Sequence, residues 1–256
     1  MSIGQVLMLN AALVSICMFV LWLISLRLRD ASIVDIFWGL GFALIAMVTF
    51  AVVPGGTRSI LLASLTTIWG VRLAAYLFKR NHGKGEDPRY KAMREYRGEN
   101  FSWVSLVTVF ALQGVVMLLV SLPIQIGQVA RAPMAVFNFI GIGVWLVGFL
   151  FESIGDYQLA KFKSTPDSRG RVLDQGLWRY TRHPNYFGNA MIWWGLSMIA
   201  ATWSTVWLII SPVFMTFLLV KVSGVALLER NLLSRSDDYR DYVKRTSAFI
   251  PWPPKS

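Results

Sequence analysis

Long apolar stretches are the feature that most restricts how this chain can fold. A helix needs roughly 20 mostly apolar residues to cross the hydrocarbon core of a bilayer. Seven stretches reach or approach that length: 6–26, 33–53, 59–78, 102–122, 134–151, 186–203 and 205–220. Charged residues make up only 15% of the chain, against about 25% in ordinary soluble domains. We therefore predict an all-α, polytopic membrane protein with seven transmembrane helices, formed by residues 1–256 as one domain.

The positive charges predict how these helices are oriented. The chain has 25 Lys and Arg residues against 14 Asp and Glu, a net charge of +11. With the N-terminus outside, the cytoplasmic segments contain 22 of the 25, while Arg58 and Arg131 lie outside and Arg72 lies within the third stretch. Basic residues are strongly enriched in cytoplasmic loops. We therefore expect a cytoplasmic C-terminus, and the positive charge requires no nucleic-acid partner.

Three of the cytoplasmic segments are longer than simple turns, namely residues 79–101, 152–185 and 221–256. Long connections of this kind are often functional, so we expect a cofactor-binding surface on this face. The chain contains only one cysteine, Cys17, and two histidines, His82 and His183, which argues against a histidine/cysteine metal site. It also has no glycine-rich nucleotide loop following a strand. A nucleotide would therefore be held by helices and loops.

Ionisable side chains within predicted spans are costly in lipid and indicate function or pairing. Asp35 lies near the cytoplasmic start of the second stretch, and Arg72 lies about two turns from the cytoplasmic end of the third. Helical spacing places Trp38 on the face of Asp35, and Tyr76 on the face of Arg72. The two charges could form a structural ion pair between helices, or they could line a pocket open to the cytoplasm. These two alternatives are compatible.

Other polar side chains allow both a structural and a functional interpretation. Asn10, Gln113 and Asn138 are more typical of hydrogen bonds between helices. If the fifth helix continues, Glu152, Asp156 and Lys163 share one face. That stripe could be a solvated salt-bridge face. It is followed by four arginines, Arg169, Arg171, Arg179 and Arg182. Arginine binds phosphate through two parallel hydrogen bonds, so the region also suits a phosphate-bearing ligand.

Several segments together resemble a known enzyme family. The most specific is Arg179-Tyr180-Thr181-Arg182-His183-Pro184-Asn185-Tyr186-Phe187-Gly188, which leads into an apolar stretch. Further matching segments are Asp35–Phe42, Trp69–Leu73, Glu86–Tyr90, Leu228–Arg230, Asp241-Tyr242 and Phe249–Trp252. This pattern resembles the steroid 5α-reductase family, particularly its bacterial branch. The first segment also occurs in sterol reductases and in isoprenylcysteine carboxyl methyltransferases, so by itself it indicates the wider superfamily.

The resemblance implies a membrane-embedded oxidoreductase acting on CH–CH groups in steroid or lipid metabolism. Such an enzyme uses NADPH, bound from the cytoplasmic side, to reduce the carbon–carbon double bond of an α,β-unsaturated ketone such as a 3-oxo-4-ene steroid. The implied partners are a hydrophobic small molecule and membrane lipids. The bacterial branch favours a bacterial inner membrane over the endoplasmic reticulum. The alternatives are an S-adenosylmethionine-dependent membrane methyltransferase and a non-catalytic transporter.

The resemblance also suggests roles for individual residues. Asp35 corresponds to the carboxyl group at the ketone oxygen, where mammalian members have glutamate. Their tyrosine partner aligns with Trp69, which has no hydroxyl, so Trp38 and Tyr76 are the candidate substitutes. The expected cofactor-binding residues are Arg72, Asp156, Lys163, Arg171, Arg182, His183, Asn185, Tyr186, Glu229 and Arg230. Asp35 can donate to the ketone only when protonated, and pairing with Arg72 would oppose that.

Overall fold

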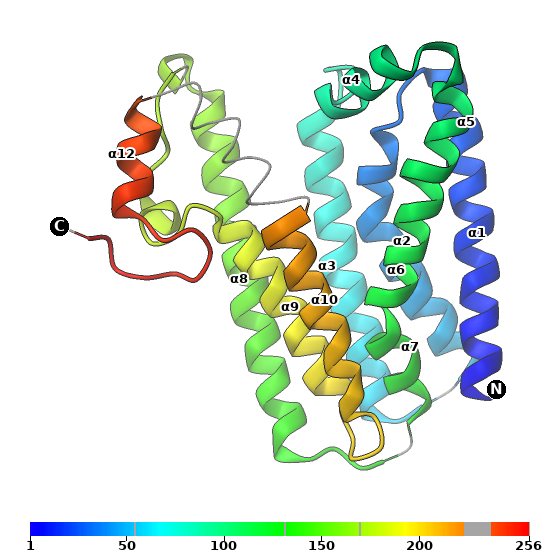
Figure 1. Ribbon diagram of the computed structural model, residues 1–256. Helices are drawn as coiled ribbons and strands as arrows, with labels where there is room; N and C mark the ends of the chain where they lie inside the picture. Colours follow the sequence, from blue (N-terminus) through cyan, green and yellow to red (C-terminus); the bar gives the residue numbers. More distant parts are fainter. Residues whose placement is uncertain (54, 131, 169, 223–236, 256) are drawn as a thin grey trace. The chain divides into compact units, whose positions relative to one another are not determined.

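The computed structural model describes residues 1–53, 55–130, 132–168, 170–222 and 237–255, and every regular element in these ranges is helical (Figure 1). Five helical segments are long and apolar enough to cross a membrane: Ile3–Leu28, Ile33–Val52, Thr57–Asn81, Pro88–Val120 and Val136–Ser164. The all-α prediction is confirmed for the described residues, and the chain has the character of an integral multi-pass membrane protein. The last two expected spans correspond to shorter helical segments, so the count of seven stays a prediction.

The chain divides into two compact units. Unit 1 comprises Met1–Met134 and Ala200–Val206, and unit 2 comprises Ala135–Ile199 and Trp207–Ser256. The single domain expected from the sequence stays a prediction.

Unit 1 is built around the close packing of two helices. Its elements are α1 (Ile3–Leu28), α2 (Ile33–Val52), α3 (Thr57–Asn81), α4 (Pro88–Arg97), α5 (Phe101–Ser105), the π-helical η2 (Leu106–Ala111), α6 (Leu112–Val120) and α7 (Leu122–Val129). Helix α2 packs most extensively on α3. A Cβ atom at Gly39 would lie 2.3 Å from the carbonyl oxygen of Gly70, and one at Gly70 would lie 2.2 Å from that of Gly39. Only glycine permits this approach.

Buried amide side chains link the helices of unit 1. The Asn10 Nδ2 donates to Thr49 Oγ1 at 2.9 Å and to Gln125 Oε1 at 3.0 Å, which confirms its predicted interhelical role. Gln125 and Gln128 belong to α7, which is mostly buried. From the sequence, this segment lies in the outside connection between the apolar stretches 102–122 and 134–151. The segment can be helical and buried because Gln125 and Gln128 form hydrogen bonds with Asn10 and Ser59, on helices that are distant in sequence.

Unit 2 centres on a second close helix pair. Its elements include α8 (Val136–Ser164), η3 (Pro166–Ser168), η4 (Gly176–Arg179), α9 (Pro184–Ala200), α10 (Ile210–Phe217), the π-helical η6 (Leu218–Val222) and α12 (Asp237–Arg245). A short 3-10 turn, η5 (Val206–Ile209), precedes α10. A Cβ at Gly148 of α8 would lie 2.6 Å from the carbonyl oxygen of Gly188 of α9. Helix α8 continues past the apolar stretch to Ser164, as the predicted face of Glu152, Asp156 and Lys163 requires.

The C-terminal segment of unit 2 fixes the loop before α9. The backbone amide of Arg182 donates to the Ser247 carbonyl at 2.9 Å, and that of Trp252 donates to the Tyr180 carbonyl at 2.9 Å. Thr181 Oγ1 donates to the Phe249 carbonyl at 2.9 Å. The two family-like segments Arg179–Gly188 and Phe249–Trp252 are therefore neighbours in space.

Candidate functional site

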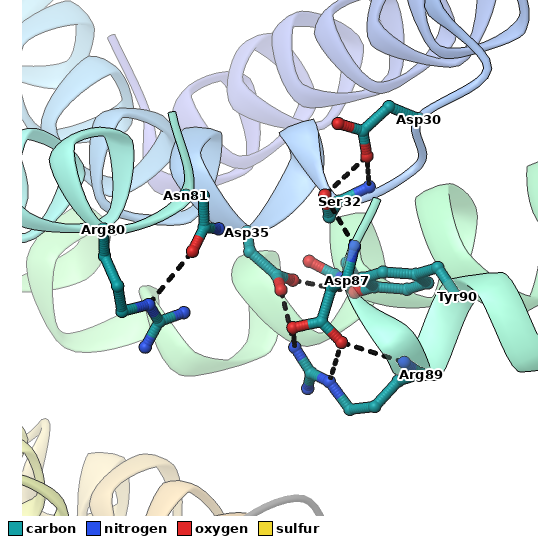
Figure 2. Close-up of polar contacts among 9 residues, drawn as sticks. Asp30, Ser32, Asp35, Arg80, Asn81, Asp87, Arg89 and Tyr90 are labelled. Carbon is teal, nitrogen blue, oxygen red and sulfur yellow. Dashed lines mark hydrogen bonds and ion pairs between the residues drawn. The ribbon is translucent and has the colours of Figure 1, made fainter. Parts of the chain in front are cut away.

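The first polar cluster lies in unit 1 around Asp35 (Figure 2). Asp35 Oδ2 accepts a hydrogen bond from Arg89 Nη2 at 2.8 Å, and its Oδ1 accepts one from the Tyr90 hydroxyl at 2.7 Å. The Tyr90 oxygen in turn accepts from Gln113 Nε2 at 3.1 Å. Tyr90 is only 7% exposed. A phenol is therefore held between an acceptor on α2 and a donor on α6.

Helix α4, which carries Arg89 and Tyr90, is itself held in place at its N-terminus. Asp87 is its N-cap and accepts from the Arg89 backbone amide at 3.0 Å, while Pro88 occupies the first turn. Glu86 binds the Arg94 guanidinium through both carboxylate oxygens, at 2.7 and 2.9 Å, and accepts from the Ala31 amide at 2.8 Å. Burial alone would raise the pKa of Glu86, but these hydrogen bonds hold it below its usual value. The carboxylate thus ties α4 to the segment before α2.

The charge pairing suggested between α2 and α3 is wrong. Within the described part of the chain, the ion pair of Asp35 is with Arg89 and not with Arg72. The Arg72 guanidinium lies over the Tyr76 ring at 5.9 Å, as their shared helical face predicts. Trp38 packs edge-on against Phe42 with ring centroids 5.0 Å apart. The catalytic roles expected for Trp38 and Tyr76 stay predictions.

The second polar cluster lies in unit 2 between α8 and α9. Asn185 Nδ2 donates to Asp156 Oδ1 at 3.3 Å, and one turn further along Asn189 Nδ2 donates to Glu152 Oε1 at 3.2 Å. Both carboxylate residues are only 3% exposed, so they do not form a solvated salt-bridge face. Asn185 lies inside α9, which begins at Pro184, so it is not the N-cap of that helix.

The remaining predicted cofactor residues have different surroundings. The buried Arg182 guanidinium donates to the carbonyls of Val243, at 3.1 Å, and Thr246. The His183 ring is stacked on Tyr186 with centroids 5.4 Å apart. Lys163 and Arg171 are exposed. Arg169, Glu229 and Arg230 lie outside the described residues.

Sequence reasoning missed some members of these clusters. Arg89 and Tyr90 occur in one of the family-like segments, but no role was assigned to them. Gln113 was predicted to bond between helices, and it does so by joining Tyr90 to α6. In unit 2, the indole of Trp178 donates to the Gly155 carbonyl at 3.2 Å and so holds the η4 turn against α8. No local sequence signal distinguishes this indole from the other tryptophans.

The fold and the two clusters define a helical multi-pass membrane protein with buried carboxylate–amide and carboxylate–phenol groups. The chain belongs to the family described as "Protein of unknown function (DUF1295)", which matches residues 21–246. The predicted resemblance to steroid 5α-reductases is confirmed by the curated relatives. No solved structure matches the chain significantly.

Two kinds of enzyme are among these relatives. Human 3-oxo-5-alpha-steroid 4-dehydrogenase 1 is 29% identical over 113 residues, which cover 44% of this chain and 40% of the relative. The enzyme of the same name from Macaca fascicularis is 35% identical over 65 residues, covering 25% of this chain and 24% of the relative. Methanethiol S-methyltransferase 1 of Bradyrhizobium diazoefficiens is 31% identical over 107 residues, covering 40% of this chain and 34% of the relative. The chain thus matches less than half of each relative's length.

Proposed function

We propose that this protein is an NADPH-dependent oxidoreductase that reduces the carbon–carbon double bond of an apolar α,β-unsaturated ketone, such as a 3-oxo-4-ene steroid or a related lipid. The names of the mammalian relatives support this reaction class. The observation that carries the proposal is the buried Tyr90 phenol, held between Asp35 and Gln113. A positioned acid of this kind is what the reaction requires.

The chemistry explains why a positioned phenol matters. When hydride adds to the β-carbon of an enone, negative charge develops on the ketone oxygen, and preorganised donors stabilise that charge. In the structure both oxygens of Asp35 accept hydrogen bonds. The Tyr90 hydroxyl has one proton, which it donates to Asp35 in the structure without substrate. We assign the donor role to this hydroxyl, with the ketone oxygen taking the place of Asp35 as its acceptor when substrate binds. Asp35 becomes a positioning residue instead of the acid that the sequence suggested. A proton from water completes the reduction at the α-carbon.

The second cluster suits a nucleotide cofactor, which supplies the hydride when bound. Asp156 and Asn185 present a carboxylate and an amide, the groups that bind ribose hydroxyls and a carboxamide. In the described part of the chain, the buried Asn189 Oδ1 and Ser153 Oγ atoms have no hydrogen-bond partner, so this helix pair offers polar groups to a ligand. The exposed Lys163 and Arg171 are the proposed phosphate contacts. We assign Arg182 a structural role because its guanidinium donates hydrogen bonds to the backbone carbonyls of Val243 and Thr246.

The membrane setting follows from the same proposal. An apolar substrate reaches the protein from the bilayer, while a charged cofactor comes from water. The proposal therefore includes seven spans, an outside N-terminus, a cytoplasmic C-terminus and a bacterial inner membrane. The charge distribution supports this orientation.

A second candidate function is methyl transfer from S-adenosylmethionine, favoured by the methanethiol S-methyltransferase relative. That cofactor lacks phosphates, so Lys163 and Arg171 would have no phosphate to bind. Calorimetry on detergent-purified protein with NADPH, NADH and S-adenosylmethionine separates the two candidates. We expect binding of NADPH in preference to the other two. Binding of S-adenosylmethionine alone would replace the reductase with the methyltransferase.

An Asn185→Asp variant tests the location of the cofactor site. It replaces the amide donor with a carboxylate next to Asp156, and two adjacent carboxylates repel both each other and a phosphate-bearing ligand. We expect NADPH affinity to fall by about tenfold or more. An Asn100→Asp variant, on the unit 1 surface, is the control. Unchanged NADPH affinity in Asn185→Asp would remove Asn185 from the site.

A further inference from the structure

A hollow at the surface of unit 1, where α4 meets α5, shares no lining residue with either cluster. Its volume is about 450 Å³, and it is lined by Tyr96, Arg97, Asn100, Trp103 and Val104. We propose that this hollow binds the headgroup of an anionic phospholipid. The proposal goes beyond the enzyme activity and does not depend on it.

The charge of the hollow comes from Arg97. The other two arginines of α4 form ion pairs: Arg89 pairs with Asp35 and Arg94 pairs with Glu86. Arg97 makes no ion pair within the described part of the chain, and its guanidinium lies over the Tyr96 ring at 5.2 Å. A guanidinium can bind two phosphate oxygens at once. The Arg97 guanidinium in the hollow can therefore bind a phosphate through two parallel hydrogen bonds.

The position of the hollow is that of a membrane interface. Helix α4 is polar and basic, whereas α5, η2 and α6 continue as an apolar segment that belongs to a candidate span. Tyr and Trp side chains are enriched where lipid headgroups meet the hydrocarbon region, and Trp103 is 69% exposed. Exposed apolar side chains continue along the same segment at Val107 and Val115. A headgroup in the hollow would thus leave its acyl chains beside apolar surface.

The wall of the hollow is firmly held before any lipid arrives. The Trp22 indole on α1 donates to the Ser102 carbonyl at 2.8 Å, and its ring lies 5.5 Å from that of Trp103. The corner itself depends on Gly98, the C-cap of α4, whose φ of +55° favours glycine. Preorganisation of this kind lowers the entropy cost of binding. These contacts hold the backbone at Ser102 and the Trp103 ring against α1.

The charge of the corner selects an anionic lipid over a neutral one. Cationic side chains near the surface of an anionic leaflet attract its lipids, and Arg97 forms no ion pair within the described residues. A zwitterionic headgroup brings its own cation into contact with the guanidinium. We therefore expect phosphatidylglycerol to be retained in preference to phosphatidylcholine.

The test is native mass spectrometry of the full-length protein released from nanodiscs that contain equal amounts of phosphatidylglycerol and phosphatidylcholine. The wild-type protein should retain phosphatidylglycerol preferentially, and Arg97→Ala should reduce that preference by about tenfold. Arg97→Lys keeps the charge but loses the planar guanidinium, so its preference for phosphatidylglycerol should lie between those of the wild-type and Arg97→Ala proteins. Lys91→Ala is the matched control, because Lys91 is an exposed cation on the same helix that does not line the hollow.

Any other outcome would overturn the proposal. An equal loss in Arg97→Ala and Lys91→Ala would mean that the lipids respond only to the general charge of α4. Equal retention of both lipids by the wild-type protein would exclude an anionic-headgroup site. Melting temperatures of all variants are measured in parallel. If Arg97→Ala fails to fold, Arg97→Lys and Trp103→Ala provide the comparison, and unchanged lipid preference in both would refute the proposal.

Discussion

Replacing Tyr90 with phenylalanine tests the acid assigned to the reaction. The change removes one oxygen and leaves the ring in its buried position. Two hydrogen bonds are lost, one to Asp35 of 2.7 Å and one from Gln113 of 3.1 Å. A hydrogen bond to a charged group contributes about 1.5–3 kcal/mol and a neutral one about 0.5–1.5 kcal/mol. Asp35 keeps its bond from Arg89, so we expect a loss of stability of about 2–4.5 kcal/mol.

The effect on turnover is expected to be larger than this loss of stability explains. Removing a donor that stabilises developing oxyanion charge lowers kcat by roughly 10²–10³-fold. The assay is single-turnover reduction of a 3-oxo-4-ene steroid at saturating NADPH, measured at a temperature where the variant is folded. NADPH affinity should be unchanged. Tyr157→Phe is the control, because its hydroxyl is exposed and makes no hydrogen bond within the described residues.

Two results would refute the reasoning in different ways. A Tyr90→Phe protein with reduced stability and wild-type turnover would leave the Asp35–Tyr90–Gln113 contacts as structural only. If stability and turnover were both unchanged, the hydrogen-bonded cluster itself would be wrong.

Three further predictions concern individual contacts. Arg171→Ala should weaken NADPH binding about tenfold or more without changing the melting temperature, whereas Arg182→Ala should lower the melting temperature by breaking buried hydrogen bonds; calorimetry and thermal unfolding on both variants distinguish these roles. The pKa of Glu86 is held below its ordinary value of 4.5, so its contribution to stability is present above that pH and is lost as the pH falls below it; Glu86→Gln should flatten the acid limb of a pH–stability profile. Gly70→Ala should destabilise the protein by about 1–3 kcal/mol or more because its Cβ would meet a backbone carbonyl, while Gly143→Ala, with open space at its Cβ, should have little effect on the melting temperature.

The sequence predicted the helices well wherever the signal was local. The second stretch was expected over residues 33–53, and α2 runs from Ile33 to Val52, because the apolar run starts after Ser32 and ends before Pro54. The sequence predicts only a connection over residues 123–133, whereas α7 there contains the buried Gln125 and Gln128. Their partners Asn10 and Ser59 lie far away in the chain, and no periodicity reveals them.

In the two polar clusters too, contacts between residues distant in sequence could not be predicted. Asp35 stands out as a carboxylate in an apolar run, but its partner Arg89 comes from a helix 54 residues further on. Arg72 was the suggested partner because it is the ionisable residue near the cytoplasmic end of the next apolar stretch. Arg182 was grouped with other arginines because they are close in sequence. Its guanidinium instead bonds to the carbonyl of Val243, which lies 61 residues away. Contacts of this kind depend on tertiary packing.

The most direct test of the proposed function follows a labelled hydride. Purified protein in nanodiscs is incubated with NADPH carrying deuterium at the transferable position of the nicotinamide and with a 3-oxo-4-ene steroid, and the product is analysed by mass spectrometry. We predict a 3-oxo steroid with one deuterium at the former β-carbon, formed together with oxidised cofactor and formed roughly 10²–10³-fold more slowly by Tyr90→Phe. A product without deuterium would contradict this prediction. So would a protein that does not reduce the steroid but transfers a methyl group from S-adenosylmethionine to a thiol.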